Sequence, residues 1–105
     1  MHPFDIYIAY VSWLGGGKTR PVLVLNQQAT DVSVFSITAQ YEGKSEAVRS
    51  KYYRINDWQQ AGLDRPSYVD TNTVRVVPKA ILAGKSKIGR LSAADELRLI
   101  EFIDR

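Results

Sequence analysis

Short runs of aliphatic and aromatic residues, separated by polar and glycine-containing segments, recur along the whole chain. Residues 4–11 and 22–25 have the aromatic and β-branched content of strands, and residues 32–38 alternate between the two faces of a strand. Further strand-like segments, bounded by turn residues, are residues 48–55, 67–70 and 73–77. The pattern predicts a mainly β chain folded as a strongly bent antiparallel sheet or small barrel.

Two segments carry the signals of a helix. Asn56 is followed three residues later by Gln59, a capping-box pattern, and Gly62 is a natural stop, so one or two helical turns are expected between them. Near the C-terminus, Ser92 precedes a segment in which apolar residues lie three apart, at Leu97, Ile100 and Ile103. That spacing predicts an amphipathic C-terminal helix packed on the sheet.

The stretch from Trp13 to Pro21, WLGGGKTRP, superficially resembles a phosphate-binding loop of nucleotide hydrolases. Such a loop needs a glycine where this chain has Ser12, and a helix must follow the lysine and threonine. Here Pro21 begins an aliphatic run typical of a strand. The surroundings are therefore strand, glycine loop and strand, which argues against an ATPase.

Composition narrows the class further. The 105 residues are enough for one domain, and 14 Lys and Arg against 11 Asp and Glu give a net charge of +3, compatible with an anionic partner. There are no cysteines, and the single histidine is His2 at the N-terminus, so thiolate or histidine metal sites and a histidine general base are not expected. The carboxylates are scattered, which gives no support for a magnesium nuclease. We expect no metal and no cofactor.

No signal peptide is recognisable at the N-terminus, because Asp5 interrupts the first apolar segment. No apolar run approaches the ~20 residues that a membrane span requires. The sequence thus predicts a soluble cytoplasmic protein that does not associate with membranes.

Several segments in sequence order resemble the MazF/PemK family of bacterial toxin endoribonucleases. They are Phe4-Asp5-Ile6-Tyr7, Thr19-Arg20-Pro21-Val22-Leu23-Val24-Leu25, Phe35-Ser36-Ile37-Thr38, Gly62-Leu63 with Arg65-Pro66-Ser67-Tyr68-Val69, and Lys87-Ile88-Gly89-Arg90-Leu91-Ser92. The resemblance implies one domain over residues 1–105 with an SH3-like antiparallel β-barrel, a short internal helix and a C-terminal helix. It also implies a homodimer that cleaves single-stranded RNA without a metal and is neutralised by a cognate antitoxin.

By matching motif, the family's catalytic arginine falls on Arg20 and its catalytic threonine on Thr38, and an RNA-holding polar residue of some relatives falls on Thr73. Many relatives have a glutamate shortly before the arginine, whereas this chain has no carboxylate between Asp5 and Arg20. Proton transfer by that glutamate therefore cannot apply here. The preferred RNA sequence is expected to differ as well.

The residue types suit RNA cleavage, since RNA supplies its own nucleophile in the 2′-hydroxyl. The planar guanidinium of Arg20 can clamp two phosphoryl oxygens but is a poor proton shuttle, and the Thr38 hydroxyl can donate to the same group. Further RNA-binding candidates are Ser36, on the same strand face as Thr38, Lys18, which could steer the backbone, and Trp13, which could stack on a base.

Structural roles compete with these assignments. Arg20 could pair with a surface carboxylate, Thr38 could be a strand former, Lys18 a solvated charge, and Trp13 a packing residue. Aromatic residues 52, 53 and 58 are interpreted as core or dimer surface rather than as an RNA platform. The basic residues 85, 87 and 90 are expected on a solvated face.

Two other functions remain open at this point. A CcdB-like toxin shares the barrel but binds DNA gyrase through its C-terminal helix without any enzymatic activity. An SH3-like module could bind RNA or a protein partner without cleaving it, and such binding would be sensitive to salt.

Overall fold

The computed structural model describes residues 1–83 and 87–105, except for the side chain of Trp13. Six strands form one antiparallel sheet in the order β4-β5-β3-β2-β1-β6. The strands are β1 (Asp5–Trp13), β2 (Gly16–Gln27), β3 (Asp31–Thr38), β4 (Tyr52–Arg54), β5 (Tyr68–Pro78) and β6 (Lys87–Arg90). The helices are α1 (Glu46–Arg49), α2 (Lys79–Ala83) and α3 (Ala93–Asp104). None of these helices has the length and apolar character needed to cross a membrane.

The predicted mainly β antiparallel fold with a C-terminal helix is confirmed, but the sheet is open rather than closed as a barrel. β4 and β6 lie at opposite edges of the sheet, and within the described residues no pairing joins them. Both edge strands are short, three and four residues long. Side chains of the turn after β4 and of α3 complete the core where a barrel would pair its edges: Ile55, Ala61, Leu63 and Leu99.

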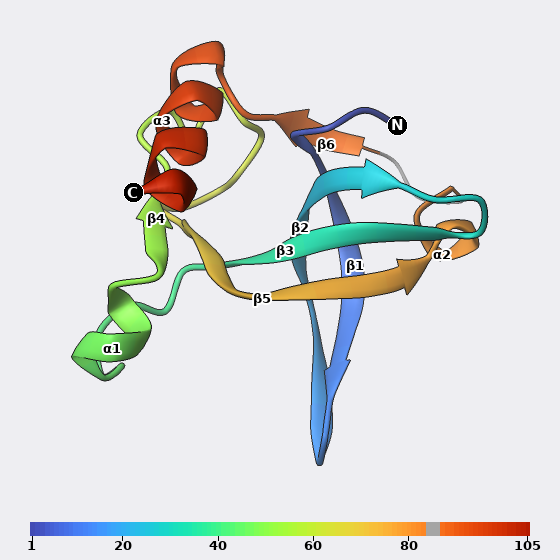
Figure 1. Cartoon of the computed structure of the whole chain (residues 1–105), viewed down its shortest axis with the longest axis horizontal. Coiled ribbons are helices and arrows are strands. Elements are labelled where there is room, and N and C mark those ends of the chain that lie inside the picture. The colour runs from blue at the N-terminus through green and yellow to red at the C-terminus, as the bar shows by residue number, and fades with distance from the viewer. Residues whose placement is uncertain (84–86) are drawn as a thin grey trace.

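The predicted glycine loop is largely a β-hairpin. Trp13 pairs with Gly16, and the register continues without a break to Ile6 and Leu23. In Figure 1 the paired ends of β1 and β2 project as a long ribbon beyond the rest of the sheet. Pro21 therefore lies inside β2 rather than at its start. The ring is tolerated there because pairing with β3 begins only at the next residue, which leaves that stretch of β2 bonded on one side.

Two other local predictions were wrong. The strand expected from residue 48 is shortened by α1, which starts because the Ser45 hydroxyl accepts a hydrogen bond from Val48 N at 3.2 Å. The helix expected from Asn56 is instead a series of turns that ends at Gly62, where φ is +90°. The backbone N–H of Asn56 donates to Asp95 of α3, so a tertiary hydrogen bond replaces the expected local cap.

The two short strands expected at 67–70 and 73–77 are one strand with a large bulge. Ser36 of β3 pairs with Asp70, and Val34 pairs with Arg75. One β3 residue, Phe35, thus stands opposite the four residues 71–74 of β5. The bulge interrupts the pairing of β3 with β5 where the break between strands was predicted, but the pairing resumes after it.

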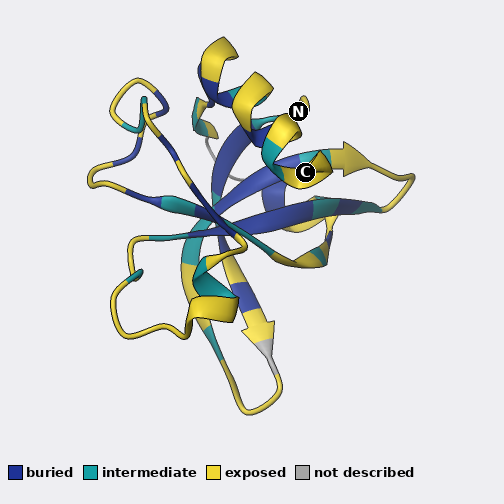
Figure 2. Ribbon diagram, turned by 60° about the vertical axis from the view of Figure 1, so that its left-hand side comes forward, coloured by how far each residue is buried: buried dark blue, intermediate teal, exposed yellow. Residues whose placement is uncertain are grey.

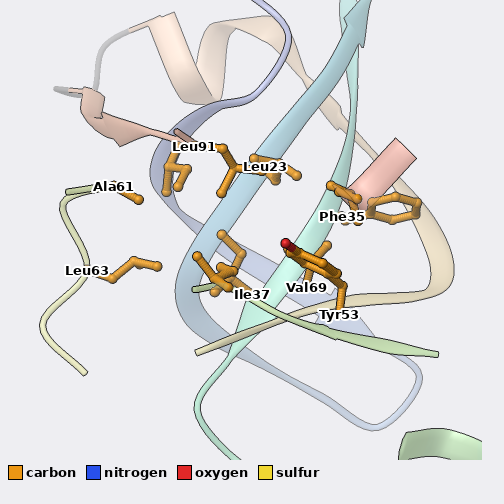
Figure 3. Packing of buried hydrophobic residues seen from close by; sticks show 11 residues of the cluster. Leu23, Phe35, Ile37, Tyr53, Ala61, Leu63, Val69 and Leu91 are labelled. Atoms are coloured by element: carbon orange, nitrogen blue, oxygen red, sulfur yellow. The ribbon is translucent and has the colours of Figure 1, made fainter. Parts of the chain in front are cut away.

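The sheet is buried on both faces. One cluster includes Leu23, Phe35, Ile37, Val69 and Leu99, and part of it is drawn in Figure 3. The other cluster lies against α2 and consists mainly of valines, with Val22, Val24, Val32, Val34 and Leu82 as members. Figure 2 shows the resulting buried centre of the long strands and their exposed ends. Neighbouring residues of β2 and β3 alternate between the clusters, which explains the unbroken aliphatic run in β2.

α3 packs through a different face from the one its spacing suggested. Leu99 is fully buried and Phe102 is partly buried against the first cluster. Leu97, Ile100 and Ile103 are 60%, 45% and 47% exposed. The apolar stripe that predicted the helix therefore faces away from the core.

Candidate functional site

The predicted catalytic pair meets where β2 and β3 separate. Val22 of β2 and Ser36 of β3 are the last pair at that end of the two strands, and Arg20 and Thr38 each lie two residues beyond it. Residues two apart share a strand face, so all four lie on one side of the sheet. The fold thus brings together two residues that are eighteen positions apart in the chain.

Both residues border an open pocket of about 500 Å³. One wall comes from β1 and β2, a second from the end of β3 and the residues after it, and a third from the loop that leads into β5. The lining residues are Ile8, Lys18, Thr19, Arg20, Pro21, Ile37, Thr38, Ala39, Gln40, Gly62, Leu63, Asp64, Arg65, Ser67 and Ile88. Aliphatic side chains surrounded by cationic and hydroxyl groups suit a ligand that has both apolar bases and anionic phosphates.

Thr38 is fixed by the segment that follows it. Its Oγ1 accepts a hydrogen bond from the backbone N–H of Gln40 at 3.1 Å. A hydroxyl that accepts in this way keeps its own hydrogen for another acceptor. Thr38 can therefore donate to a ligand oxygen from a fixed position.

Two glycines hold the third wall of the pocket. A Cβ on Gly62 would lie 2.0 Å from the carbonyl oxygen of Ile88, and one on Gly89 would lie 1.9 Å from that of Ala61. The turn after β4 and strand β6 therefore touch backbone to backbone. This contact gives a physical reason for the Gly62-Leu63 and Ile88-Gly89 segments in the sequence resemblance.

A buried carboxylate ties the same turn to α3. Asp95 accepts hydrogen bonds from the Tyr53 hydroxyl at 2.5 Å, from the backbone N–H groups of Asn56 and Asp57 at 3.1 and 2.8 Å, and from Ser92 Oγ at 3.3 Å. Burial by itself raises the pKa of Asp95, but these bonds outweigh it and lower the pKa. Burial and the bond to this carboxylate raise the pKa of Tyr53. The pocket wall thus depends on a network centred on a buried, charged carboxylate.

Electrostatics connect Arg20 to two residues that the sequence did not suggest. Asp70 pairs with Ser36 on one side and with Tyr52 on the other, which sets these three in one row across the sheet. Burial raises the pKa of Tyr52, the Asp70 carboxylate raises it further, and the Arg20 guanidinium opposes the change. Tyr52 and Asp70 come from strands far along the chain, and no motif in the sequence marks them.

The other predicted RNA-binding residues do not all lie at the pocket. Lys18 borders the pocket with Arg20. Ser36 is buried within β3, and Thr73 is exposed in the β5 bulge; neither is among the described residues that line the pocket. The side chain of Trp13 lies outside the part that the structure describes.

The predicted basic face near the C-terminus has a structural role. Lys87 Nζ and Arg90 Nη1 each lie 3.6 Å from Oδ1 of Asp5, which is 1% exposed. Arg90 also binds Glu96 at 2.8 Å and so connects β1, β6 and α3. Lys85 is outside the described residues. Elsewhere, within residues 1–83 and 87–105, no group of three or more His, Cys, Asp or Glu is placed to hold a metal ion.

The same fold is found in solved structures of small β-rich toxins. The chain is similar to the Mycobacterium tuberculosis toxin MazF-mt6, with 29% identity, a TM-score of 0.70 and coverage of 94% of this chain and 91% of that one. It is also similar to the crystal structure of an Mtb toxin, with 26% identity, a TM-score of 0.65 and coverage of 92% and 96%. No curated protein sequence gives a significant match.

The profile of the PemK-like, MazF-like toxins of type II toxin-antitoxin systems matches residues 2–101. The chain belongs to this family, whose members are endoribonucleases. The resemblance stated from the sequence is therefore confirmed.

Proposed function

We propose that this protein is a metal-independent endoribonuclease toxin that cuts single-stranded RNA, mRNA included, at short sequence motifs in the cytoplasm. The products have 2′,3′-cyclic phosphate and 5′-hydroxyl ends. The observation that carries the proposal is that Arg20 and Thr38, from neighbouring strands, border the same pocket. Family membership supports the substrate class.

In the proposed reaction the RNA provides the nucleophile. The 2′-oxygen loses its proton and bonds to the adjacent phosphorus, the bond to the 5′-oxygen breaks, and the leaving oxygen gains a proton. Arg20 remains charged and donates to two non-bridging oxygens, whose negative charge grows in the transition state. Thr38 donates its hydroxyl hydrogen to the same group, and Lys18 attracts the neighbouring phosphate.

The test is cleavage of a long RNA of varied sequence in EDTA, with the ends mapped. We expect Arg20→Ala to lower the rate by roughly 10²- to 10³-fold, as expected when a transition-state donor is removed. We expect Thr38→Val, which keeps the shape of the side chain, to reduce the rate without unfolding the protein. Arg75→Ala is the matched control, since Arg75 is a half-buried arginine of β5 that is not among the described lining residues.

Three results would overturn the proposal: no cut RNA with the wild type, cleavage only with an added divalent ion, or an Arg20→Ala variant as fast as wild type. Thermal unfolding separates catalysis from folding. Loss of activity together with a large loss of stability would show that Arg20 is structural. Toxicity that survives Arg20→Ala but is lost on changing the exposed face of α3 would favour a gyrase-type binder.

The proposal includes a homodimer and a cognate antitoxin that covers the RNA pocket. The exposed apolar residues Leu97, Ile100 and Ile103 of α3 support a protein contact on that face. Sedimentation velocity measures the mass: two chains are expected, and a monomer at micromolar concentration would contradict the dimer.

A further inference from the structure

A second hollow of about 470 Å³ adjoins the pocket of Arg20 and Thr38. The two share Ala39 and Gln40, which directly follow β3. The second hollow is lined by Ala39, Gln40, Tyr41, Glu42, Gly43, Lys44, Pro66 and Tyr68. A chain that passes through the first pocket can therefore continue into the second without leaving the surface.

Two tyrosines from separate segments, Tyr41 and Tyr68, line this hollow, and a third, Tyr52, packs beside them. The rings of Tyr41 and Tyr68 stack with centroids 4.5 Å apart and planes inclined by 19°. Tyr52 lies 6.3 Å from each of them. The guanidinium of Arg49 is 5.4 Å from the Tyr41 ring centroid. The group thus combines aromatic faces with a positive charge.

Core packing explains only one of the three rings, that of Tyr52, which is buried. Tyr41 and Tyr68 belong to neither hydrophobic cluster of the described residues. Tyr41 and Tyr68 are only half-buried, and both border the hollow. Two large rings are therefore stacked on each other at the surface, and both border the hollow.

The position of the stack relative to the reacting phosphate follows from the register. Tyr68 of β5 pairs with Thr38 of β3. Side chains directly opposite each other on neighbouring strands have Cβ atoms about 5 Å apart. The aromatic group thus begins one strand away from the threonine expected to donate to the scissile phosphate. That separation places it within reach of an adjoining nucleotide.

We propose that Tyr41 and Tyr68 form a subsite that stacks on the base of a nucleotide next to the scissile phosphate. This inference rests on the proposed function, since it assumes that RNA occupies the first pocket. A base suits the site because every base has a π-face that stacks on aromatic rings. Lys44 and Arg49 attract the backbone phosphates, and the Glu42 carboxylate can accept a hydrogen bond from an amino group of the base. The subsite therefore contributes to the choice of cleavage motif.

The test measures binding and does not depend on cleavage. Single-stranded oligonucleotides in which fluorine replaces every 2′-hydroxyl, and which therefore lack the nucleophile, are titrated into wild type and into Tyr41→Leu and Tyr41→Phe variants. An abasic unit then replaces one base at a time along the oligonucleotide. Leucine removes the ring but keeps an apolar side chain, and phenylalanine keeps the ring.

For wild type we expect one abasic position to weaken binding by roughly 5- to 150-fold, the range for loss of one stacked base. Tyr41→Leu should weaken binding of the intact oligonucleotide by a similar factor, and at that abasic position it should have no further effect. Tyr41→Phe should bind as wild type does. This non-additivity identifies the base that contacts the tyrosine.

The remaining outcomes distinguish a failure of the base subsite from a failure of the nuclease proposal. If Tyr41→Leu binds every oligonucleotide as tightly as wild type, the subsite is overturned and the nuclease proposal stands. If the abasic effect appears but the wild type cuts no RNA, the subsite stands and the nuclease proposal fails. If no RNA binds, both fail. Normal RNA binding and cleavage by Tyr41→Leu, with lost inhibition by the antitoxin, would assign the hollow to a peptide instead and overturn the base subsite.

Discussion

Replacing Asp95 by asparagine tests the network that connects α3 to the wall of the pocket. The carboxylate is fully buried, and each of its oxygens accepts from one backbone N–H: Oδ1 from Asn56 and Oδ2 from Asp57. An asparagine of the same shape has one oxygen and one NH₂ group. In either orientation of the amide, one backbone N–H faces another donor. Rotation of the hydroxyls of Tyr53 and Ser92 cannot repair that clash.

The magnitude follows from the bonds that are lost. These N–H groups are part-buried, and one of them left without an acceptor costs up to about 1–3 kcal/mol. The remaining bonds also lose the strength that a charged acceptor gives them. We expect Asp95→Asn to lower the free energy of unfolding by about 3 kcal/mol at pH 7, a large share of the ~5–15 kcal/mol that a domain of this size has. Because the turn after β4 holds the pocket wall, RNA cleavage should fall as well.

Urea unfolding followed by circular dichroism measures this difference, and its pH dependence tests the cause. The pKa of Asp95 is lower in the folded chain than its ordinary value of 3.8. The stability that the ionised Asp95 carboxylate contributes is therefore fully present above that value. It is lost as the pH falls through the lower pKa of the folded chain. The gap between wild type and Asp95→Asn should shrink in acid.

The matched control is Asp104→Asn, at the exposed end of the same helix, which should change stability by less than about 0.5 kcal/mol. The reasoning is refuted if Asp95→Asn is as stable as wild type at neutral pH. It is also refuted if the gap between them stays constant down to pH 3.

Two further substitutions test the other contacts around the site. Gly89→Ala places a methyl 1.9 Å from the Ala61 carbonyl oxygen, so we expect a loss of about 3 kcal/mol or more, measured by urea unfolding, with reduced cleavage; unchanged stability would show that the turn and β6 separate easily. Asp5→Ala leaves the cations of Lys87 and Arg90 without their buried partner. Both cations are half-exposed and can turn to solvent, so we expect a loss of only about 2 kcal/mol, below that of a fully buried pair; thermal melting that shows no loss would contradict the ion-pair assignment.

Much of the site could be predicted because its motifs are local. Arg20 and Thr38 were assigned from short segments of sequence, and the fold places both at one pocket, just beyond the last pair of β2 and β3. Their catalytic roles stay predictions. Tyr52, Asp70 and the stacked pair Tyr41 and Tyr68 were not recognised, because each comes from a different segment and no spacing connects them.

Local signals failed where tertiary contacts competed with them. The capping pattern at Asn56 predicted a helix, but its backbone N–H is bound by Asp95, thirty-nine residues away. The stripe of Leu97, Ile100 and Ile103 identified α3 correctly. Periodicity alone could not show that Leu99, rather than the stripe, enters the core. The apolar side of an amphipathic helix can contact another protein instead of the core of its own domain.

The sequence by itself determined the β-rich class, the C-terminal helix, the family and the candidate residues Arg20 and Thr38. These depend on the secondary-structure preferences of residues, on the alternation of strand residues and on short motifs. All three are local features of the sequence. Only the tertiary structure decided that the sheet stays open, that a glycine contact and a buried carboxylate hold the pocket wall, and that tyrosines line a second hollow beside it. Those features depend on which distant segments meet, and that is set by the packing of the whole core.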